Sequence, residues 1–242
     1  MKSQSGNILF LILIAVALFA ALSYAVTSSS RSGGSNLREK AQVSSASIIN
    51  FATSMKAATD RLRLSNGCTD TTISFENPVV TTNFNYVNAS ASQKCFVFHP
   101  EGGGLSWPAD SLVNGLPKSM IIAGSNQVKD VGTNCPTSPY SPCNELVLLL
   151  IDLSKEKCME INAKLGIEQS GQDTPEIPDI NAGSGFTGTY GNTARWFGNV
   201  STDSSLAGQM SGCFRETTTQ SYAAYTSTSQ TPYIFYQVLM AR

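Results

Sequence analysis

The residues with the most distinctive chemistry are six cysteines, all of which lie after residue 67 of the 242-residue chain. Their number is even, no two of them form a Cys-x-x-Cys pair, and the chain has one histidine. This pattern favours three disulfides in an exported domain over a zinc site, with free buried thiols in a cytoplasmic protein as the alternative. The disulfide candidates are Cys68, Cys95, Cys135, Cys143, Cys158 and Cys213.

One cysteine pair is favoured by its spacing, although the sequence does not select among the other pairings. Cys135 and Cys143 enclose PTSPYSP, a short segment with three prolines. Such a loop is stiff and its ends are apt to meet, so we favour a Cys135–Cys143 bond. Closing a loop of this length stabilises a fold by roughly 2.5 kcal/mol in the chain-entropy treatment.

The residue types that most enzymes need are scarce. His99 is the single imidazole, and it precedes Pro100 in a predicted turn, so neither a Ser-His-Asp nor a Cys-His arrangement is indicated. The glycines at 102–104 lack the lysine and the strand-to-helix context of a phosphate-binding loop. We therefore expect no catalytic site and no cofactor.

Three acidic residues at a spacing of three, Asp173, Glu176 and Asp179, lie in a proline-containing loop and could supply oxygen ligands to Ca²⁺. The spacing of an EF-hand is absent, and a solvated acidic loop is the favoured interpretation.

The chain carries 16 basic and 17 acidic residues, a net charge of −1. That balance gives no reason to expect a nucleic-acid partner.

The N-terminal region contains an uncharged apolar run from Ile8 to Val26. As a helix it would extend about 28 Å, close to the ~30 Å hydrocarbon core of a bilayer. It has no polar stripe, which argues against an amphipathic helix on a membrane surface. We therefore predict a transmembrane or assembly helix over residues 7–26.

The six residues before this run, MKSQSG, end in Gly6, and that arrangement resembles the leader of type IV prepilins. The resemblance covers about the first 26 residues. It implies that a prepilin peptidase cuts between Gly6 and Asn7 and that the apolar helix is kept as the assembly helix of a pilin or pseudopilin. Most members have Glu at the fifth mature position, where this chain has Leu11, and a large apolar first residue, where it has Asn7. Some minor pseudopilins at filament tips also lack that Glu.

The resemblance also bears on the acidic loop, because pseudopilins of some secretion systems bind calcium in such loops. The resemblance thus implies that Asp173, Glu176 and Asp179 are weak calcium candidates. The Asn88-Ala89-Ser90 segment matches a glycosylation sequon, which has little meaning in a bacterial protein.

Two other interpretations of the N-terminus remain open. In one, the run serves, without any filament, as the anchor of a bitopic membrane protein that binds a ligand at the periplasmic side or the surface. In the other, Lys2 and the small-residue segment Ser23-Tyr24-Ala25 would suit a cleaved secretory signal. The cleaved signal is disfavoured because the apolar run is long.

The charges around the span and the cysteines disagree about topology. Arg31, Arg38 and Lys40 follow the span, which by the positive-inside rule would place the C-terminal side in the cytoplasm. The cysteines and the prepilin-type leader place it outside. We therefore expect a bacterial inner-membrane protein with its head in the periplasm, or at the cell surface once assembled. The expected partners are the membrane, a prepilin peptidase, and other pilin-like subunits or copies of the chain.

The predicted organisation is a leader (1–6), the apolar helix (7–26), a flexible Ser- and Gly-rich linker (27–36) and a head (37–242). Within the head we expect a helix over 37–64 that starts at a capping box, Asn36 with Glu39, and ends at Asn66-Gly67. The sheet region covers 68–242.

Within the sheet region, β-branched and aromatic residues predict five strands, at 71–75, 94–98, 119–123, 145–153 and 233–240. A short helix is expected from Ser154 to Leu165, and a long loop over 169–192. The last strand is apolar on both faces, which predicts an interior position. The fold class is α+β, a long helix packed on an antiparallel sheet and stabilised by disulfides.

Overall fold

The computed structural model describes residues 5–30, 33–76, 86–107, 120–167, 173–177, 180, 185–192, 195–197, 204–217, 221–222, 225–226 and 232–242. The chain divides into two compact units, Met1–Ala41 and Gln42–Arg242. The second unit contains the sheet, the three disulfides and the hydrophobic core.

Helix α1 (Ser5–Ser30) covers the whole predicted apolar run. The predicted linker over 27–36 is wrong in extent, because α1 continues through Ser30 and α2 (Gly33–Ser65) begins at Gly33. Residues 31 and 32 lie outside the described residues. Extending a helix that is already formed adds one hydrogen bond per residue, so serine and glycine at its end do not stop it.

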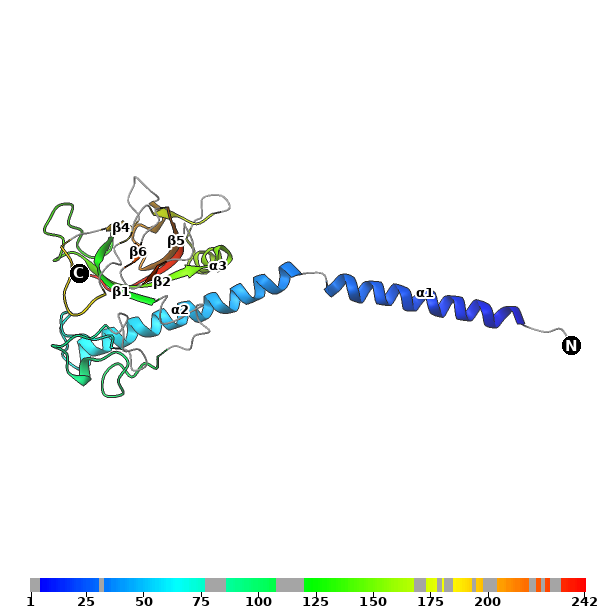
Figure 1. Cartoon of the computed structure of the whole chain (residues 1–242), viewed down its shortest axis with the longest axis horizontal. Helices are drawn as coiled ribbons and strands as arrows, with labels where there is room; N and C mark the ends of the chain where they lie inside the picture. Colours follow the sequence, from blue (N-terminus) through cyan, green and yellow to red (C-terminus); the bar gives the residue numbers. More distant parts are fainter. Residues whose placement is uncertain are drawn as a thin grey trace. The chain divides into compact units, whose positions relative to one another are not determined.

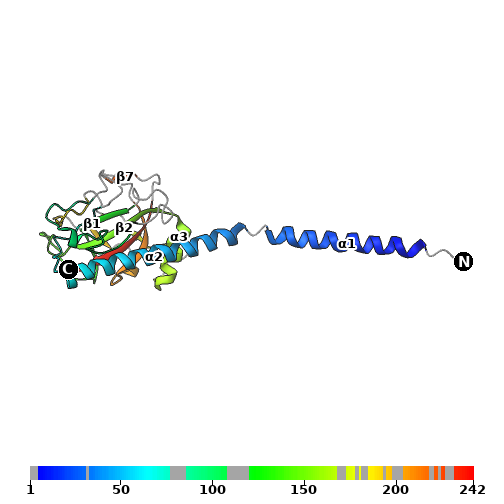
Figure 2. The same cartoon turned by 90° about the horizontal axis from the view of Figure 1, so that it is seen from below.

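Within the second unit, α2 contributes one buried face. Residues at helical spacing are fully or almost fully buried there: Ile48, Ala52, Met55, Ala58 and Leu62. Figures 1 and 2 both show this part of α2 running alongside the sheet. The predicted end is confirmed, since α2 stops at Ser65 and Gly67 has a left-handed φ of 66°. The predicted start at Asn36 is wrong, because Asn36 lies inside the helix.

Among the described residues, the main sheet has six strands in the order β3-β5-β8-β2-β1-β4. Its antiparallel centre pairs β5 with β8, β8 with β2 and β2 with β1, and the short outer strands β4 and β3 are parallel to their neighbours. Strands β6 and β7 pair antiparallel in a separate two-stranded sheet. The bounds are Met120–Val128 (β1), Glu145–Leu153 (β2), Glu176–Ile177 (β3), Arg195–Phe197 (β4), Ser211–Glu216 (β5), Ser221–Tyr222 (β6), Tyr225–Thr226 (β7) and Tyr233–Met240 (β8).

Both faces of the sheet are covered. On one face, Leu148, Leu150 and Phe235 pack with the buried residues of α2. On the other face, Leu149, Phe214 and Tyr236 pack with Ile177 of β3 and with residues outside the strands, which are Val131, Ile167, Ile180 and Leu206. Strands buried on two sides read as continuous apolar runs, which is why β2 and β8 have the bounds expected from the sequence. The α+β prediction is confirmed.

The third helix, α3 (Lys155–Leu165), follows β2 directly. The Ser154 side chain accepts a hydrogen bond from the Lys157 amide, and Gly166 ends the helix in the left-handed conformation. Two predicted strands are wrong. The segment 71–75 contains a turn and isolated bridges at Ser74 and Phe75, and 94–98 begins in a 3₁₀ turn at Gln93–Cys95.

Candidate functional site: an apolar helix and a disulfide-bonded domain

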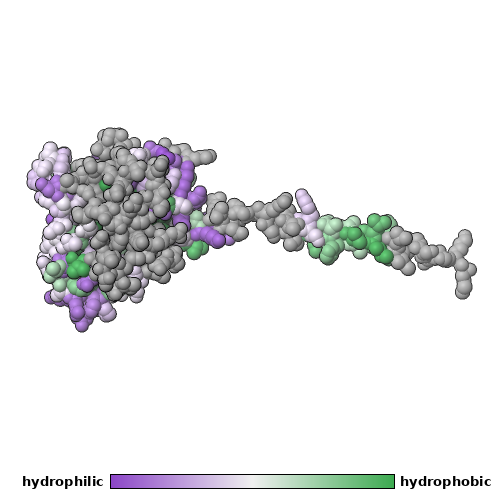
Figure 3. All heavy atoms as spheres, in the orientation of Figure 1, coloured by the Kyte–Doolittle hydropathy of each residue, from purple (hydrophilic) through white to green (hydrophobic). Residues whose placement is uncertain are grey.

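Helix α1 presents apolar side chains in every direction. Ten large apolar residues of this helix are between 41% and 76% exposed, and Figure 3 shows hydrophobic colouring over the described part of α1. Helical spacing distributes these positions around the whole circumference. A helix that is apolar all round is normally buried in a protein core or in lipid. The exposed residues are Phe10, Leu11, Ile12, Leu13, Ile14, Val16, Leu18, Phe19, Leu22 and Tyr24.

The predicted processing residues, Gly6 and Asn7, lie in the first turn of α1. In the described part of the chain, no helix is both long enough and apolar enough to cross a membrane. The helix itself was predicted from the sequence, and the peptide bond between Gly6 and Asn7 stays a predicted cleavage site.

The six cysteines form three disulfides in the second unit. The pairs are Cys68–Cys95, Cys135–Cys143 and Cys158–Cys213, with Cα–Cα separations of 5.8, 5.6 and 5.3 Å. These separations lie in the ordinary range for disulfides. The pair that the proline-rich spacing favoured, Cys135–Cys143, is among them.

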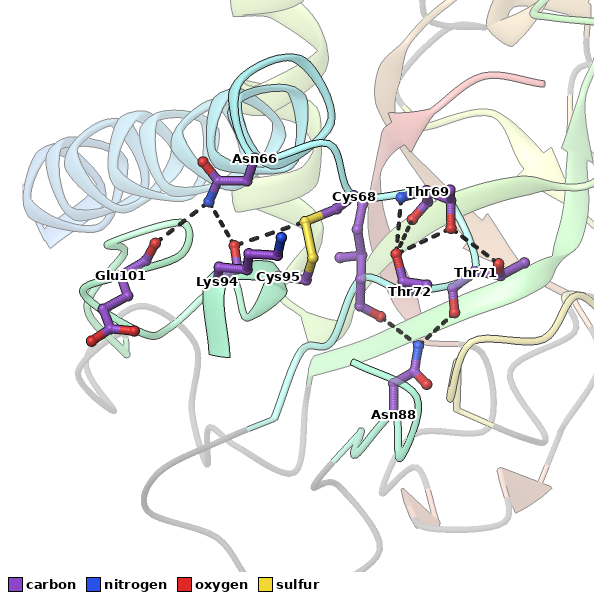
Figure 4. The surroundings of a disulfide bond; sticks show 10 residues. Asn66, Cys68, Thr69, Thr71, Thr72, Asn88, Lys94, Cys95 and Glu101 are labelled. Atoms are coloured by element: carbon purple, nitrogen blue, oxygen red, sulfur yellow. Dashed lines mark hydrogen bonds between the residues drawn. A yellow bond between two sulfur atoms is a disulfide. The ribbon is translucent and has the colours of Figure 1, made fainter. Parts of the chain in front are cut away.

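Figure 4 shows how the first disulfide fastens the end of α2 to the segment around residue 95. The Asn66 amide donates to the Lys94 carbonyl oxygen at 2.6 Å, next to the Cys68–Cys95 bond. One turn earlier on α2, the Arg61 guanidinium donates to the Gly102 carbonyl oxygen. The end of α2 is therefore held by a covalent bond and by two side chains.

The acidic loop that the sequence offered as a weak calcium candidate is neutralised by the protein's own cations. Arg215 pairs with both Asp173 and Glu176, and Lys155 lies 3.4 Å from Asp173. Although partial burial acts to raise it, hydrogen bonds and these two cations hold the pKa of Asp173 below its ordinary value. Asp179 lies outside the described residues.

No group of three or more acidic, His or Cys residues in the described ranges is arranged to hold a metal ion. The carboxylates of Asp173 and Glu176 are thus engaged in structural contacts. The favoured interpretation, a solvated acidic loop, is therefore incomplete, because these two carboxylates are ion-paired. The loop is tied to α3 and β5 by salt bridges, which are worth modest amounts at a solvated surface.

His99 and Asn88 have structural contacts. The His99 ring accepts a hydrogen bond from the Glu101 amide within the predicted turn. Asn88 is 3% exposed, and its amide donates to the carbonyl oxygens of Thr71 and Ile73. An asparagine committed in this way has no free amide for a glycan, so this sequon is structural.

Two buried polar residues escaped the sequence analysis. Glu145 and Asn162 are fully buried, and each contacts backbone from a distant part of the chain. The sequence around these two residues gave no indication of their burial, because Glu145 begins an apolar strand and Asn162 lies in a helix that mixes polar and apolar residues.

Comparison of the chain with protein-family models, with curated proteins and with solved structures finds no match.

Proposed function

We propose that the chain is a structural subunit of a type IV pilus-like or type II secretion pseudopilus-like filament, of minor or tip type. The observation that carries the proposal is the exposure of apolar side chains all round α1. Such a surface needs lipid or other helices to cover it. The leader that ends in Gly6 supports a subunit that is processed and then assembled.

The mechanism is packing, with no chemical step. In this proposal α1 is held in the bacterial inner membrane, leaves the bilayer on assembly, and exchanges lipid contacts for contacts with neighbouring helices. Small residues let helix backbones approach closely in an apolar environment. The helix has five alanines within the apolar run, Ala15, Ala17, Ala20, Ala21 and Ala25.

The second unit would then be the exported head, in the periplasm before assembly and at the surface afterwards. Its three disulfides support this assignment, since disulfides persist in oxidising compartments. Prepilin peptidase, the membrane and other pilin-like subunits are the proposed partners. We propose no enzymatic role for the head.

Mass spectrometry of the mature N-terminus, in protein from its native host, tests the proposal. The expected terminus is Asn7, after loss of the six-residue leader. Replacing Gly6 with a bulky residue, Gly6→Leu, should leave the leader in place and prevent assembly, whereas Ser5→Ala should be processed normally. An intact Met1 or a terminus at Val26 in the wild-type protein would contradict the proposal.

A bitopic membrane-anchored binding protein is the second candidate function. The observation that favours it is Leu11, which stands where most filament subunits have Glu. Single cysteines placed along residues 8–26 distinguish the two candidates. A filament subunit should give ladders of crosslinked oligomers whose yield varies with position along the helix. A lone anchor should give monomers and random dimers at every position.

A further inference from the structure

The end of the sheet where β1 meets β2 contains an unusual concentration of buried polar side chains. Five polar residues there are at most 6% exposed: Ser125, Asn126, Gln127, Asn144 and Glu145. The pairing of β1 with β2 is irregular between Ala123 and Asn126, and Asn126 is the cross-strand partner of Glu145. A register irregularity of this kind frees backbone groups that side chains must satisfy.

Glu145 satisfies one of these groups. Its Oε2 atom accepts a hydrogen bond from the Val128 amide at 3.1 Å. Its other oxygen, Oε1, is buried and has no hydrogen-bond donor in the described part of the chain. An ionised carboxylate with an unpartnered oxygen is expensive to bury.

Arg242 is the cation whose field reaches Glu145, and it is committed elsewhere. Its Nε atom lies 3.1 Å from an oxygen of Asp70, and its guanidinium lies 3.8 Å over the Tyr190 ring. Its Nη1 atom donates to the Ser141 carbonyl oxygen at 2.6 Å. In the turn after β1, Lys129 and Asp130 pair with each other at the surface.

These surroundings favour the protonated carboxyl group. Burial raises the pKa of Glu145 to about 8, and the amides of Glu145 and Val128 and the charge of Arg242 offset this effect only in part. The raised pKa favours the protonated form of Glu145 in the folded protein at neutral pH.

We propose that Glu145 makes this end of the sheet a pH-sensitive lock, which is closed while its carboxyl group is protonated and loosened when that group loses its proton to solvent. Ionisation places a negative charge beside Val128, and the carboxylate then competes with Asp70 and Tyr190 for the Arg242 guanidinium. The inference is independent of the proposed filament role.

The elements that the lock controls follow from the same contacts. Gln127 holds the backbone of Cys135 by two hydrogen bonds, of 2.9 and 3.4 Å. Arg242 holds Ser141 in the same disulfide loop. Loosening the end of β1 and withdrawing Arg242 would remove two attachments of the Cys135–Cys143 loop, while the disulfide keeps the loop closed and the Tyr140 amide still donates to Asn192 Oδ1 at 3.0 Å.

The sign of the pH dependence follows from proton linkage. The folded-state pKa of about 8 lies above the ordinary value of 4.5, so the folded state binds more protons between these two pH values. The stabilisation that the protonated Glu145 contributes is complete below pH 4.5. It decreases as the pH rises above that value and is lost once the pH has passed the folded-state pKa. Across that window, the unfolding equilibrium constant should rise by up to tenfold per pH unit.

The test compares the full-length wild-type chain with Glu145→Gln, a neutral side chain of the same shape. Urea unfolding with intact disulfides, measured in detergent from pH 4 to pH 9.5, should show the variant becoming progressively more stable than the wild type as the pH rises. Glu156→Gln, which removes an exposed carboxylate on α3, is the matched control and should follow the wild type. Parallel pH curves for the wild type and Glu145→Gln would overturn the proposal.

A second measurement locates the change and remains informative if Glu145→Gln fails to fold. Hydrogen exchange at pH 9, compared with the same measurement at pH 6.5 after correction for intrinsic rates, should show selective loss of protection in residues 127–144. Arg242→Gln should lower the protection of this segment already at pH 6.5 and so reduce the difference between the two pH values, because its contact with Ser141 is then absent at both. Uniform loss across the sheet, or no loss, would contradict a local lock.

Discussion

Asn162 holds the backbone of Cys213 with both ends of its amide. Its Nδ2 atom donates to the Cys213 carbonyl oxygen, and its Oδ1 atom accepts from the Cys213 amide, each at 2.8 Å. The side chain is fully buried, next to the disulfide that joins Cys158 to the same residue. The disulfide and the amide thus fasten α3 to β5 at one point.

Replacing this amide by a carboxylate should be severe. Asn162→Asp loses the donor and places a carboxylate oxygen against the Cys213 carbonyl, so we expect a loss of roughly 2–4 kcal/mol in the free energy of unfolding. Asn162→Ala should lose about 1–3 kcal/mol through the unsatisfied backbone groups. Urea unfolding at pH 7 measures both, with the exposed Asn50→Asp as the control. Equal stability of Asn162→Asp and wild type would show that the two bonds contribute nothing.

At this scale the sequence predicted residues by chemical type and missed those defined by their surroundings. The cysteines could be identified from the sequence because an even number of cysteines without a Cys-x-x-Cys pair is typical of disulfides. Asn162 and Glu145 look like ordinary polar residues, and what makes them important is backbone brought from 51 and 17 residues away. The calcium candidates Asp173 and Glu176 are the converse case. Their chemical type suggested a metal site, but Arg215, which is distant in sequence, pairs with both carboxylates.

The elements were predictable where the local pattern is strong and self-contained. Strands β2 and β8 and helix α3 have the expected bounds, because continuous apolar runs and capping residues specify them locally. The expected strands at 71–75 and 94–98 failed because the Cys68–Cys95 disulfide and a cluster of threonine hydroxyls fix turns there. A covalent bond between distant residues and local side-chain hydrogen bonds together override the local strand preference here.

The three disulfides should contribute in the order of the loops that they close. Their sequence separations are 8 residues for Cys135–Cys143, 27 for Cys68–Cys95 and 55 for Cys158–Cys213. Chain entropy then gives stabilisations of roughly 2.5, 3.5 and 4 kcal/mol. Paired Cys→Ser variants, unfolded in urea without reductant, should lose stability in this order.

When a reductant is added to the native protein, the order in which the disulfides are reduced should depend on their exposure as well as on the length of the loops they close. Cys135 is half-buried, whereas both cysteines of each of the other two pairs are buried, so a dithiol should reduce Cys135–Cys143 first. Mass spectrometry after timed alkylation identifies the reduced pair. Reduction of Cys158–Cys213 before Cys135–Cys143 would contradict this expectation.

For the whole molecule, the central position of β8 determines how the head can fold. Strand β8 pairs with β2 on one side and β5 on the other, although 79 residues lie between the end of β2 and the start of β8. Its side chains also contribute to both cores, Phe235 on one face and Tyr236 on the other. The central pairings of the sheet therefore cannot form until residues 233–240 are present.

Truncation after Gln230 should consequently abolish folding of the head. Each large side chain of β8 that leaves the core removes roughly 1.5–3 kcal/mol, and several are lost together, whereas a typical domain has a total stability of ~5–15 kcal/mol. The control is deletion of residues 1–32, which removes α1 and should leave the head folded with its three disulfides. Circular dichroism with thermal unfolding, together with non-reducing electrophoresis, measures both variants. A truncated head that stays soluble and unfolds cooperatively would show that β8 belongs to an interface with a partner, and that β2 and β5 form a stable sheet without it.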